Sequence, residues 1–243
     1  MRILLDTFIN DRDDVPFTIP GVPGVVNTFK DLKGKDVPDF VEVIENADIA
    51  NPGTIVRLGI KISDKFEPPD RFLLTRYPQK ANDAHKKYDV PVVPFIGDSK
   101  SSGDAKTGAD SCVVMYWNAK TLKRGETREM GFTYGLGSVT VGGGGKLALT
   151  VGGRMFKGGE LTVVALVADP TAKNATLKLP PGLEHIDPKK ETQPIETQRE
   201  GRPSSVTWQV RATSIGERLL TVTTDSKLMN NRKVKINAQS LFN

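Results

Sequence analysis

The 243-residue chain has few of the residues that build metal centres and covalent cross-links: one cysteine and two histidines. A single cysteine cannot form a disulfide within the chain, and cysteine clusters for zinc or iron–sulfur sites are excluded. His85 and His185 lie far apart in polar stretches, so a histidine zinc site would require both halves of the chain to converge. We therefore predict no metalloenzyme, and we expect Cys112, inside the apolar run SCVVMYW, to be buried.

Motifs of nucleophilic and nucleotide chemistry are also absent. The chain has no Gly-x-Ser-x-Gly elbow. Thr140 stands where a dinucleotide-binding fingerprint needs its third glycine, and Leu147 stands where a P-loop needs serine or threonine. We predict that the protein is not an enzyme. A sugar-active enzyme stays as an alternative, but no motif brings together the two carboxylates that it would need.

Long hydrophobic runs and dense charge stripes are missing too. No segment approaches the ~18 apolar residues of a membrane-spanning helix, so we expect no membrane insertion. The excess of Lys and Arg falls in residues 146–243, where it is spread along the segment. Nucleic-acid binding would need a dense basic stripe or a recognisable module, so we do not expect it. Residues 1–9 read as a strand rather than a signal peptide, which predicts a chain truncated at its start and leaves the localisation open.

What the chain does have is two-residue alternation of apolar and polar side chains, the pattern of half-buried strands. The alternation is sharpest at Val206, Trp208 and Val210, which are separated by polar residues. Turn signals such as Asp169-Pro170 divide residues 146–243 into about seven short strands, the spacing of a β-sandwich.

Three local features of this segment carry a resemblance: the turn Gly158-Gly159-Glu160, the strand that closes in Asp169-Pro170, and the corner Leu179-Pro180-Pro181-Gly182-Leu183. Together with the strand path KLALTVGGRMFKGGELTVVALVADP, ATLKLPPGLE and SVTWQVRATSIGERLLTVTTDS, residues 146–237 resemble bacterial immunoglobulin-like modules of the CARDB and fibronectin-like kind. The resemblance implies an immunoglobulin-like sandwich that serves as a spacer or adhesion module in a secreted or cell-surface protein.

Residues 1–141 also read mostly as strands, at 2–9, 54–62, 71–77, 111–117 and 127–134. One helix is expected from residue 38 to about 50, because Phe40, Val41 and Ile44 form an apolar stripe behind Pro38. The stretch LKRGETREMGFTYGLG reads as a sandwich strand entered through a Leu-x-x-Gly-Glu turn at Leu122, Gly125 and Glu126. Residues 1–141 as a whole are loosely similar to supersandwich-type β-sandwich domains of multidomain bacterial secreted proteins. The glycine run at 142–145 predicts a linker. The expected fold is therefore all-β, with two tandem β-sandwiches, the second immunoglobulin-like, and one short helix in the first domain.

Aromatic side chains that face solvent could stack on sugars, and Tyr116, Trp117 and Tyr134 are the candidate ligand-binding residues. Tyr116 and Trp117 are neighbours in one predicted strand, so one of them faces outward unless protein covers both faces of the sheet. Packing inside the protein is the alternative for this pair.

Oxygen-bearing side chains crowd the segment that follows the first strand. Asp6, Asn10, Asp11, Asp13 and Asp14 supply carboxylate and amide oxygens within a few residues, and such oxygens are the ligands of Ca²⁺. A solvated turn, in which Asp and Asn side chains bond to their own backbone, is the alternative. No other cofactor is predicted.

Taken together, the sequence favours a non-catalytic structural, adhesion or binding module of a larger extracytoplasmic bacterial protein. Its expected partners are other domains of the parent chain, a cell-surface protein or a polysaccharide. A carbohydrate-binding accessory module, calcium-dependent if the acidic segment binds the ion, is the alternative. By resemblance, the module would be extracellular, periplasmic or at the cell surface.

Overall fold

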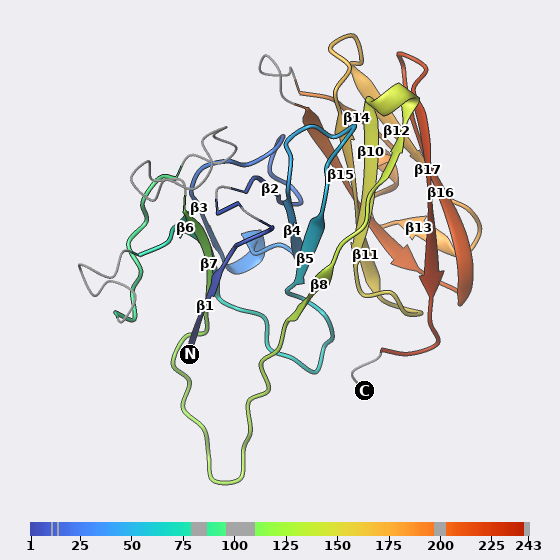
Figure 1. Ribbon diagram of the computed structural model, residues 1–243. Coiled ribbons are helices and arrows are strands. Elements are labelled where there is room, and N and C mark those ends of the chain that lie inside the picture. Colours follow the sequence, from blue (N-terminus) through green and yellow to red (C-terminus); the bar gives the residue numbers. More distant parts are fainter. Residues whose placement is uncertain (11, 14, 79–86, 96–109, 197–202, 241–243) are drawn as a thin grey trace.

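The computed structural model describes residues 1–10, 12–13, 15–78, 87–95, 110–196 and 203–240 (Figure 1). The regular secondary structure of these residues is almost entirely β-strand, and the strands form four antiparallel sheets. Helical structure in the described part is limited to the 3-10 turns η1 (Gly34–Asp36), η4 (Gly143–Gly145) and η5 (Pro188–Lys190). The predicted all-β fold class is therefore confirmed.

The first part of the chain supplies two of the sheets, named here sheet I and sheet II. Sheet I has the order β1-β7-β6-β3, with β1 (Arg2–Asp6), β7 (Ser111–Tyr116), β6 (Arg71–Arg76) and β3 (Lys30–Lys33). Sheet II has the order β2-β4-β5-β8, with β2 (Phe17–Thr18), β4 (Phe40–Ile44), β5 (Ile55–Gly59) and β8 (Thr133–Leu136).

The rest of the chain supplies sheets III and IV. Sheet III has the order β13-β15-β11-β10-β9, with β13 (Leu183–His185), β15 (Ser204–Ala212), β11 (Glu160–Val167), β10 (Leu147–Gly153) and β9 (Thr140–Gly142). Sheet IV has the order β14-β12-β16-β17, with β14 (Thr192–Pro194), β12 (Asn174–Lys178), β16 (Gly216–Thr224) and β17 (Met229–Ile236). In β15 the predicted alternation is confirmed, because Val206, Trp208 and Val210 are buried while Gln209 and Arg211 are exposed.

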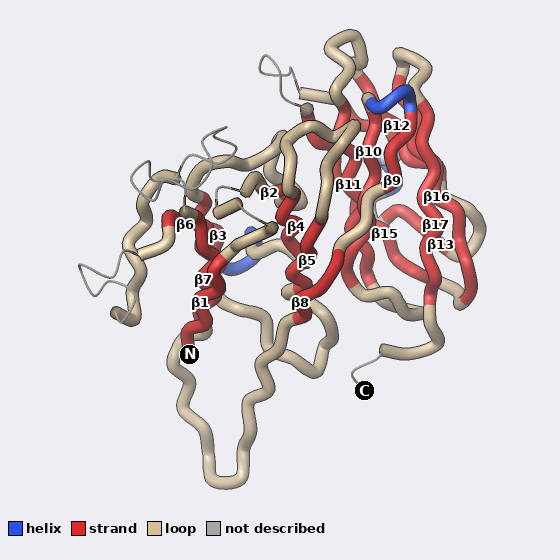
Figure 2. Tube along the Cα trace, in the orientation of Figure 1, coloured by secondary structure: helices blue, strands red, loops and turns tan. Residues whose placement is uncertain are grey.

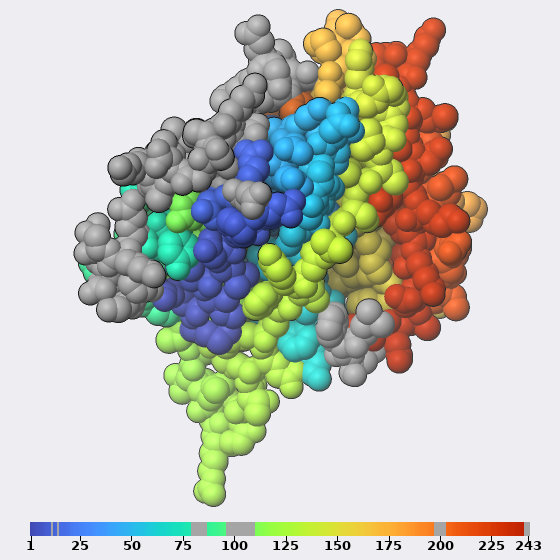
Figure 3. Space-filling view, viewed as in Figure 1, coloured from blue at the N-terminus to red at the C-terminus, as the bar shows by residue number. Residues whose placement is uncertain are grey.

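The four sheets stack as successive layers in the order I, II, III, IV (Figures 1 and 2). One large apolar core lies between sheets I and II and another between sheets III and IV, so each pair of sheets makes a sandwich. A smaller core joins the two sandwiches where sheet II meets sheet III; its buried members are Phe40, Ile49, Ala148, Val164 and Leu166. The space-filling view shows the two halves of the chain in contact along this seam (Figure 3).

The helix predicted over residues 38–50 is wrong, because residues 40–44 form β4. All five residues of β4 are buried, since sheet II is covered by sheet I on one face and by sheet III on the other. Val41 and Val43 pack toward sheet I, whereas Phe40 packs toward sheet III. A strand buried on both faces is apolar at nearly every position, so its sequence does not show the two-residue alternation that identifies a strand.

The glycine run at 142–145, which we expected to be a linker, lies in a turn between β9 and β10 of sheet III. The two strands pair antiparallel, with Gly142 opposite Leu147. Gly143, Gly144 and Gly145 all have positive φ, a backbone conformation that side-chain-bearing residues rarely adopt. The chain passes from the first sandwich to the second before this turn, in the short connection between β8 and β9.

Candidate functional site

The structure buries two of the three aromatic side chains proposed for sugar stacking. Tyr116 at the end of β7 is 3% exposed, and Trp117, the next residue, is 0% exposed. The hydroxyl of Tyr116 accepts a hydrogen bond from the backbone N–H of Val90 at 2.9 Å, and the Tyr88 ring packs against it edge to face. Protein therefore covers both faces of the sheet here, and neither ring is available to stack on a ligand.

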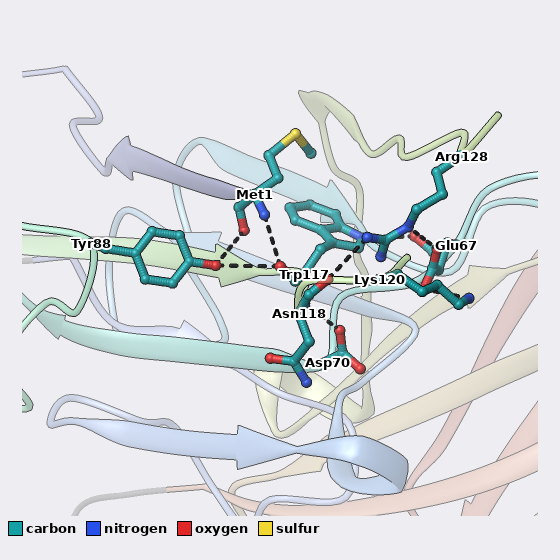
Figure 4. Close-up of polar contacts among 8 residues, drawn as sticks. All are labelled: Met1, Glu67, Asp70, Tyr88, Trp117, Asn118, Lys120 and Arg128. Atoms are coloured by element: carbon teal, nitrogen blue, oxygen red, sulfur yellow. Dashed lines mark hydrogen bonds and ion pairs between the residues drawn. The ribbon is translucent and has the colours of Figure 1, made fainter. Parts of the chain in front are cut away.

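A frame of polar contacts holds Trp117 in place (Figure 4). Its indole N–H donates to the carbonyl of Glu67 at 2.8 Å, and its backbone exchanges hydrogen bonds with Met1 at 2.8 and 2.9 Å. The hydroxyl of Tyr88 lies 3.2 Å from the Met1 carbonyl. The Glu67 carboxylate pairs with Arg128 at 2.8 Å, and this hydrogen bond holds the pKa of Glu67 below its ordinary value. The buried indole is therefore part of the structural core of the first sandwich.

Tyr134, the third aromatic candidate, is 58% exposed in β8. Strand β8 is the last strand of sheet II, beside β5. The neighbouring exposed apolar side chain is Leu136, at 85%. Tyr134 is therefore the one predicted ligand-binding residue whose ring is open to solvent.

The predicted calcium residues are only partly brought together. Asp6 and Asp13 approach one another as expected, but the third member of their group is Asp110, which sequence analysis missed. One carboxylate oxygen from each of these three side chains lies within 4.8 Å of the others. Asn10 lies apart from them, since its amide contacts Thr54 at 3.5 Å. Asp11 and Asp14 lie outside the described residues.

We call Asp6, Asp13 and Asp110 the carboxylate cluster. Backbone pairing brings their three segments together. Asp6 ends β1 opposite Cys112, and Asp110 directly precedes β7. The carbonyl of Asp13 accepts hydrogen bonds from the backbone N–H and the hydroxyl of Ser111, both at 3.1 Å. Three segments that are distant in sequence therefore meet at one end of sheet I.

The electrostatics of the carboxylate cluster favour a bound proton or cation. Burial, followed by the charges of Asp6 and Asp13, raises the pKa of Asp110 from 3.8 to about 7. Burial and the charge of Asp13 raise the pKa of Asp6 as well. Oδ1 of Asp110 is buried and has no hydrogen-bond partner among the described residues. Arg76 is the positive charge that opposes the shift of Asp110.

Cys112 and the two histidines are the other residues considered for nucleophilic chemistry or metal binding. Cys112 is buried, and this burial raises the pKa of its thiol, so the side chain is a packed apolar group as predicted. His185 Nε2 lies 3.0 Å from the carbonyl of Leu177. His85 lies outside the described residues.

The junction between the two sandwiches is organised around one buried carboxylate. Glu42 in β4 is 2% exposed, and its Oε1 accepts hydrogen bonds from Arg57 Nε at 3.0 Å and Nη2 at 2.6 Å. Thr150 in β10 of the other sandwich donates to the same oxygen at 2.8 Å. Arg57 also donates to the carbonyl of Val151 at 2.7 Å and lies over the ring of Phe40, 4.7 Å from its centroid. We call Glu42, Arg57 and Thr150 the junction triad.

Other contacts extend this junction on both sides of the triad. Thr162 in β11 donates to Asp39 at 2.6 Å, and Ser205 in β15 donates to the carbonyl of Val22 at 2.9 Å. Arg154 forms an ion pair with Asp64. These contacts tie β11, β15 and the residue that follows β10 to the first sandwich.

A glycine makes close packing at the junction possible. A Cβ atom on Gly152 in β10 would overlap the ring of Phe40, so this ring lies directly against the backbone of sheet III. Phe40 is 1% exposed. The apolar core and the hydrogen bonds of the junction therefore require the same placement of one sandwich on the other.

Comparison of the chain with protein-family models finds no match, and comparison with curated proteins also finds none. Within the described residues, no helix has the length and apolar character needed to cross a membrane. The junction triad and the carboxylate cluster are the features of the structure that bear on function.

Proposed function

We propose that the protein is a non-catalytic structural module of a larger extracytoplasmic bacterial protein, in which the two sandwiches act as one rigid spacer. The observation that carries this proposal is the junction triad, buried between sheets II and III. The placement outside the cytoplasm comes from the resemblance of residues 146–237 to immunoglobulin-like modules of secreted proteins. Its partners are then the domains that precede or follow it in the parent chain, or a cell-surface protein.

A buried charge is informative about rigidity because it tolerates little displacement. A hydrogen bond to a charged group contributes about 1.5–3 kcal/mol, and a buried charge that loses its partner costs more than that gain. Arg57 pairs with Glu42 within sheet II, and its bonds to sheet III go to Thr150 and Val151. Sliding one sandwich over the other would break these bonds to sheet III, together with the bond from Thr150 to Glu42. The junction therefore favours a single relative orientation of the two sandwiches.

The burial of Tyr116 and Trp117 also favours a structural module over a carbohydrate-binding module. A carbohydrate-binding module needs aromatic rings with an open face, and these two rings serve the core instead. Tyr134 remains open, but the polar side chains that usually surround a sugar are replaced there by the exposed apolar Leu136.

Small-angle X-ray scattering tests the spacer directly. We expect the scattering of the intact chain to fit one compact arrangement of the two sandwiches at every salt concentration. The variant Arg57→Met should broaden the distribution of distances, whereas Lys233→Met, at an exposed ion pair with Glu217, should not. A wild-type chain that already samples many orientations would contradict the proposal. Stabilisation of the chain by a polysaccharide would favour the carbohydrate-binding alternative.

A second function, calcium binding, is favoured by the carboxylate cluster. We propose that Asp6, Asp13 and Asp110 bind Ca²⁺, which takes carboxylate oxygens as ligands. Three carboxylates this close repel one another when ionised, and this repulsion contributes to the raised pKa values of Asp6 and Asp110. A divalent cation would remove the repulsion and stabilise the ionised form. The ion would join β1 to β7 at one end of sheet I.

Thermal unfolding with and without CaCl₂ tests this site. At about pH 7.5 we expect Ca²⁺ to raise the unfolding temperature of the wild type, because a ligand of the native state stabilises it. Asp110→Asn should abolish most of this shift, and Glu217→Gln, which removes an exposed carboxylate on the other sandwich, should leave it intact. An equal shift in the wild type and in Asp110→Asn would show that the ion binds elsewhere.

A further inference from the structure

Strand β8 leaves one row of backbone groups unpaired in the described part of the protein. On one side it pairs antiparallel with β5, and the order of sheet II ends with it. The N–H of Gly137 donates to the carbonyl of Ile55 at 2.8 Å. This bond shows which residues of the strand direct their backbone N–H and C=O groups toward β5. Along a strand, successive residues direct their backbone N–H and C=O groups to opposite sides. The backbone groups of Gly135 therefore also point toward β5, whereas those of Tyr134 and Leu136 point away from the sheet.

The side chains beside this open row are apolar and exposed. Tyr134 and Leu136 lie opposite Leu58 and Val56 of β5, so they share one face of sheet II. The whole segment 131–145 contains no charged residue and no proline. Three other edge strands carry devices that usually prevent pairing: β3 has Lys30 and Lys33, β14 ends in Pro194, and β17 has several basic residues. In the space-filling view this segment runs as an uncovered yellow-green strip across the front of the molecule (Figure 3).

We propose that β8 pairs antiparallel with β8 of a second copy of this chain, about a two-fold axis at Gly135. In this register Tyr134 of each copy lies opposite Leu136 of the other, and their outward backbone groups form four hydrogen bonds. The two Gly135 residues face each other as a non-hydrogen-bonded pair, the position at which backbones approach most closely. The paired sheet II would then run continuously through both copies.

The sequence of β8 fits a second copy because the register is self-complementary. An aromatic ring lies opposite a leucine on each side of the axis, and such cross-strand pairs stabilise sheets. The glycine at the axis brings no side chain into the close contact. The chain has a formal net charge of +5, yet the segment that would meet its own copy is neutral, so like charges do not oppose the pairing locally. This inference is independent of the proposed spacer function, since it concerns the free edge and not the junction.

Disulfide trapping tests the register. A Cβ on Gly135 would meet nothing within 4 Å, and its φ is not in the left-handed region, so Gly135→Cys should fold normally. Opposed residues of a non-hydrogen-bonded pair lie about 4.5 Å apart at Cα, which is within the range of a disulfide. We expect Gly135→Cys to form a covalent dimer rapidly under mild oxidation. The native Cys112 is buried and should not react, and Leu219→Cys, on the exposed face of sheet IV, is the matched control.

Charge-swap variants test the same surface without a cross-link. Sedimentation of the wild type should show reversible association above the monomer mass of 26.5 kDa, to twice that mass. Tyr134→Lys/Leu136→Lys and Tyr134→Glu/Leu136→Glu should each be monomeric, because like charges would lie opposite each other, and their equimolar mixture should restore the dimer. A monomeric wild type at all concentrations would overturn the proposal. So would a dimer that survives both double variants, or one that Gly135→Cys does not trap faster than Leu219→Cys.

Discussion

Replacing Arg57 by methionine removes the charge partner of a carboxylate that is 2% exposed. The change deletes two hydrogen bonds to Glu42, one to Thr150 and one to the Val151 carbonyl, while keeping an apolar stem over Phe40. Breaking a buried ion pair costs about 3–5 kcal/mol. Because the Arg57 side chain retains 22% exposure and water can partly replace it, we expect a loss near the lower limit, about 3 kcal/mol.

The assay is urea unfolding followed by tryptophan fluorescence, with Lys233→Met as the control. The Lys233–Glu217 pair is 67% and 65% exposed, so its loss should change the free energy of unfolding by less than about 1 kcal/mol. The double variant Glu42→Leu/Arg57→Met should recover most of the stability, since apolar replacement of a buried pair is often neutral. If Arg57→Met costs no more than Lys233→Met, the buried contacts of the junction triad do not stabilise the fold.

Three further outcomes follow from the same structure. Gly152→Ala should destabilise the protein by about 1–3 kcal/mol in urea unfolding, because its Cβ would overlap Phe40. In Gly135→Ala the new Cβ meets nothing within 4 Å, so the free energy of unfolding should change by less than about 1 kcal/mol. Equal effects of the two variants would contradict the close packing of Phe40 on Gly152. Without calcium, Asp110→Asn should be more stable than the wild type at about pH 8, because the ionised carboxylate is disfavoured in the folded state. The pKa of Asp110 rises from 3.8 to about 7 on folding, so its stabilising contribution is complete below 3.8 and is lost as the pH rises through 7. Thermal unfolding should therefore show the wild type gaining stability relative to Asp110→Asn on acidification from about pH 8 to pH 5, and parallel profiles would refute the shift.

The second sandwich could be predicted from sequence most clearly where its strands are buried on one face. In β15, and in β16 from residue 220 to 223, the alternation of apolar and polar residues matches the alternation of buried and less buried side chains. In the first sandwich the secondary-structure prediction failed at β4, which is buried on both faces of its sheet. Phe40, Val41 and Ile44 are consistent with a helical stripe, and only the stacking of sheet II between sheets I and III makes them a strand.

The candidate sites could also be predicted only in part from the sequence. Asp6 and Asp13 were predicted together because they are close in sequence, whereas Asp110 joins them only through the pairing of β1 with β7. Glu42 and Arg57 were not singled out, since an acidic and a basic residue fifteen positions apart are common in any sequence. The signal that could have drawn attention to Glu42 is its position between valines in a strongly apolar segment, FVEVI. Trp117 was considered for ligand binding, but the contacts that bury it come from Met1, Glu67 and Tyr88, which are remote in sequence.

The central claim, that the two sandwiches behave as one rigid body, can be measured with the two tryptophans of the chain. Trp117 lies in the core of the first sandwich and Trp208 in the core of the second. Incorporation of 5-fluorotryptophan gives one ¹⁹F resonance for each sandwich, assigned with Trp117→Phe and Trp208→Phe. During urea titration of the otherwise unchanged protein, the account predicts that both native resonances disappear at the same midpoint with the same slope. Loss of one resonance while the other stays native would contradict it.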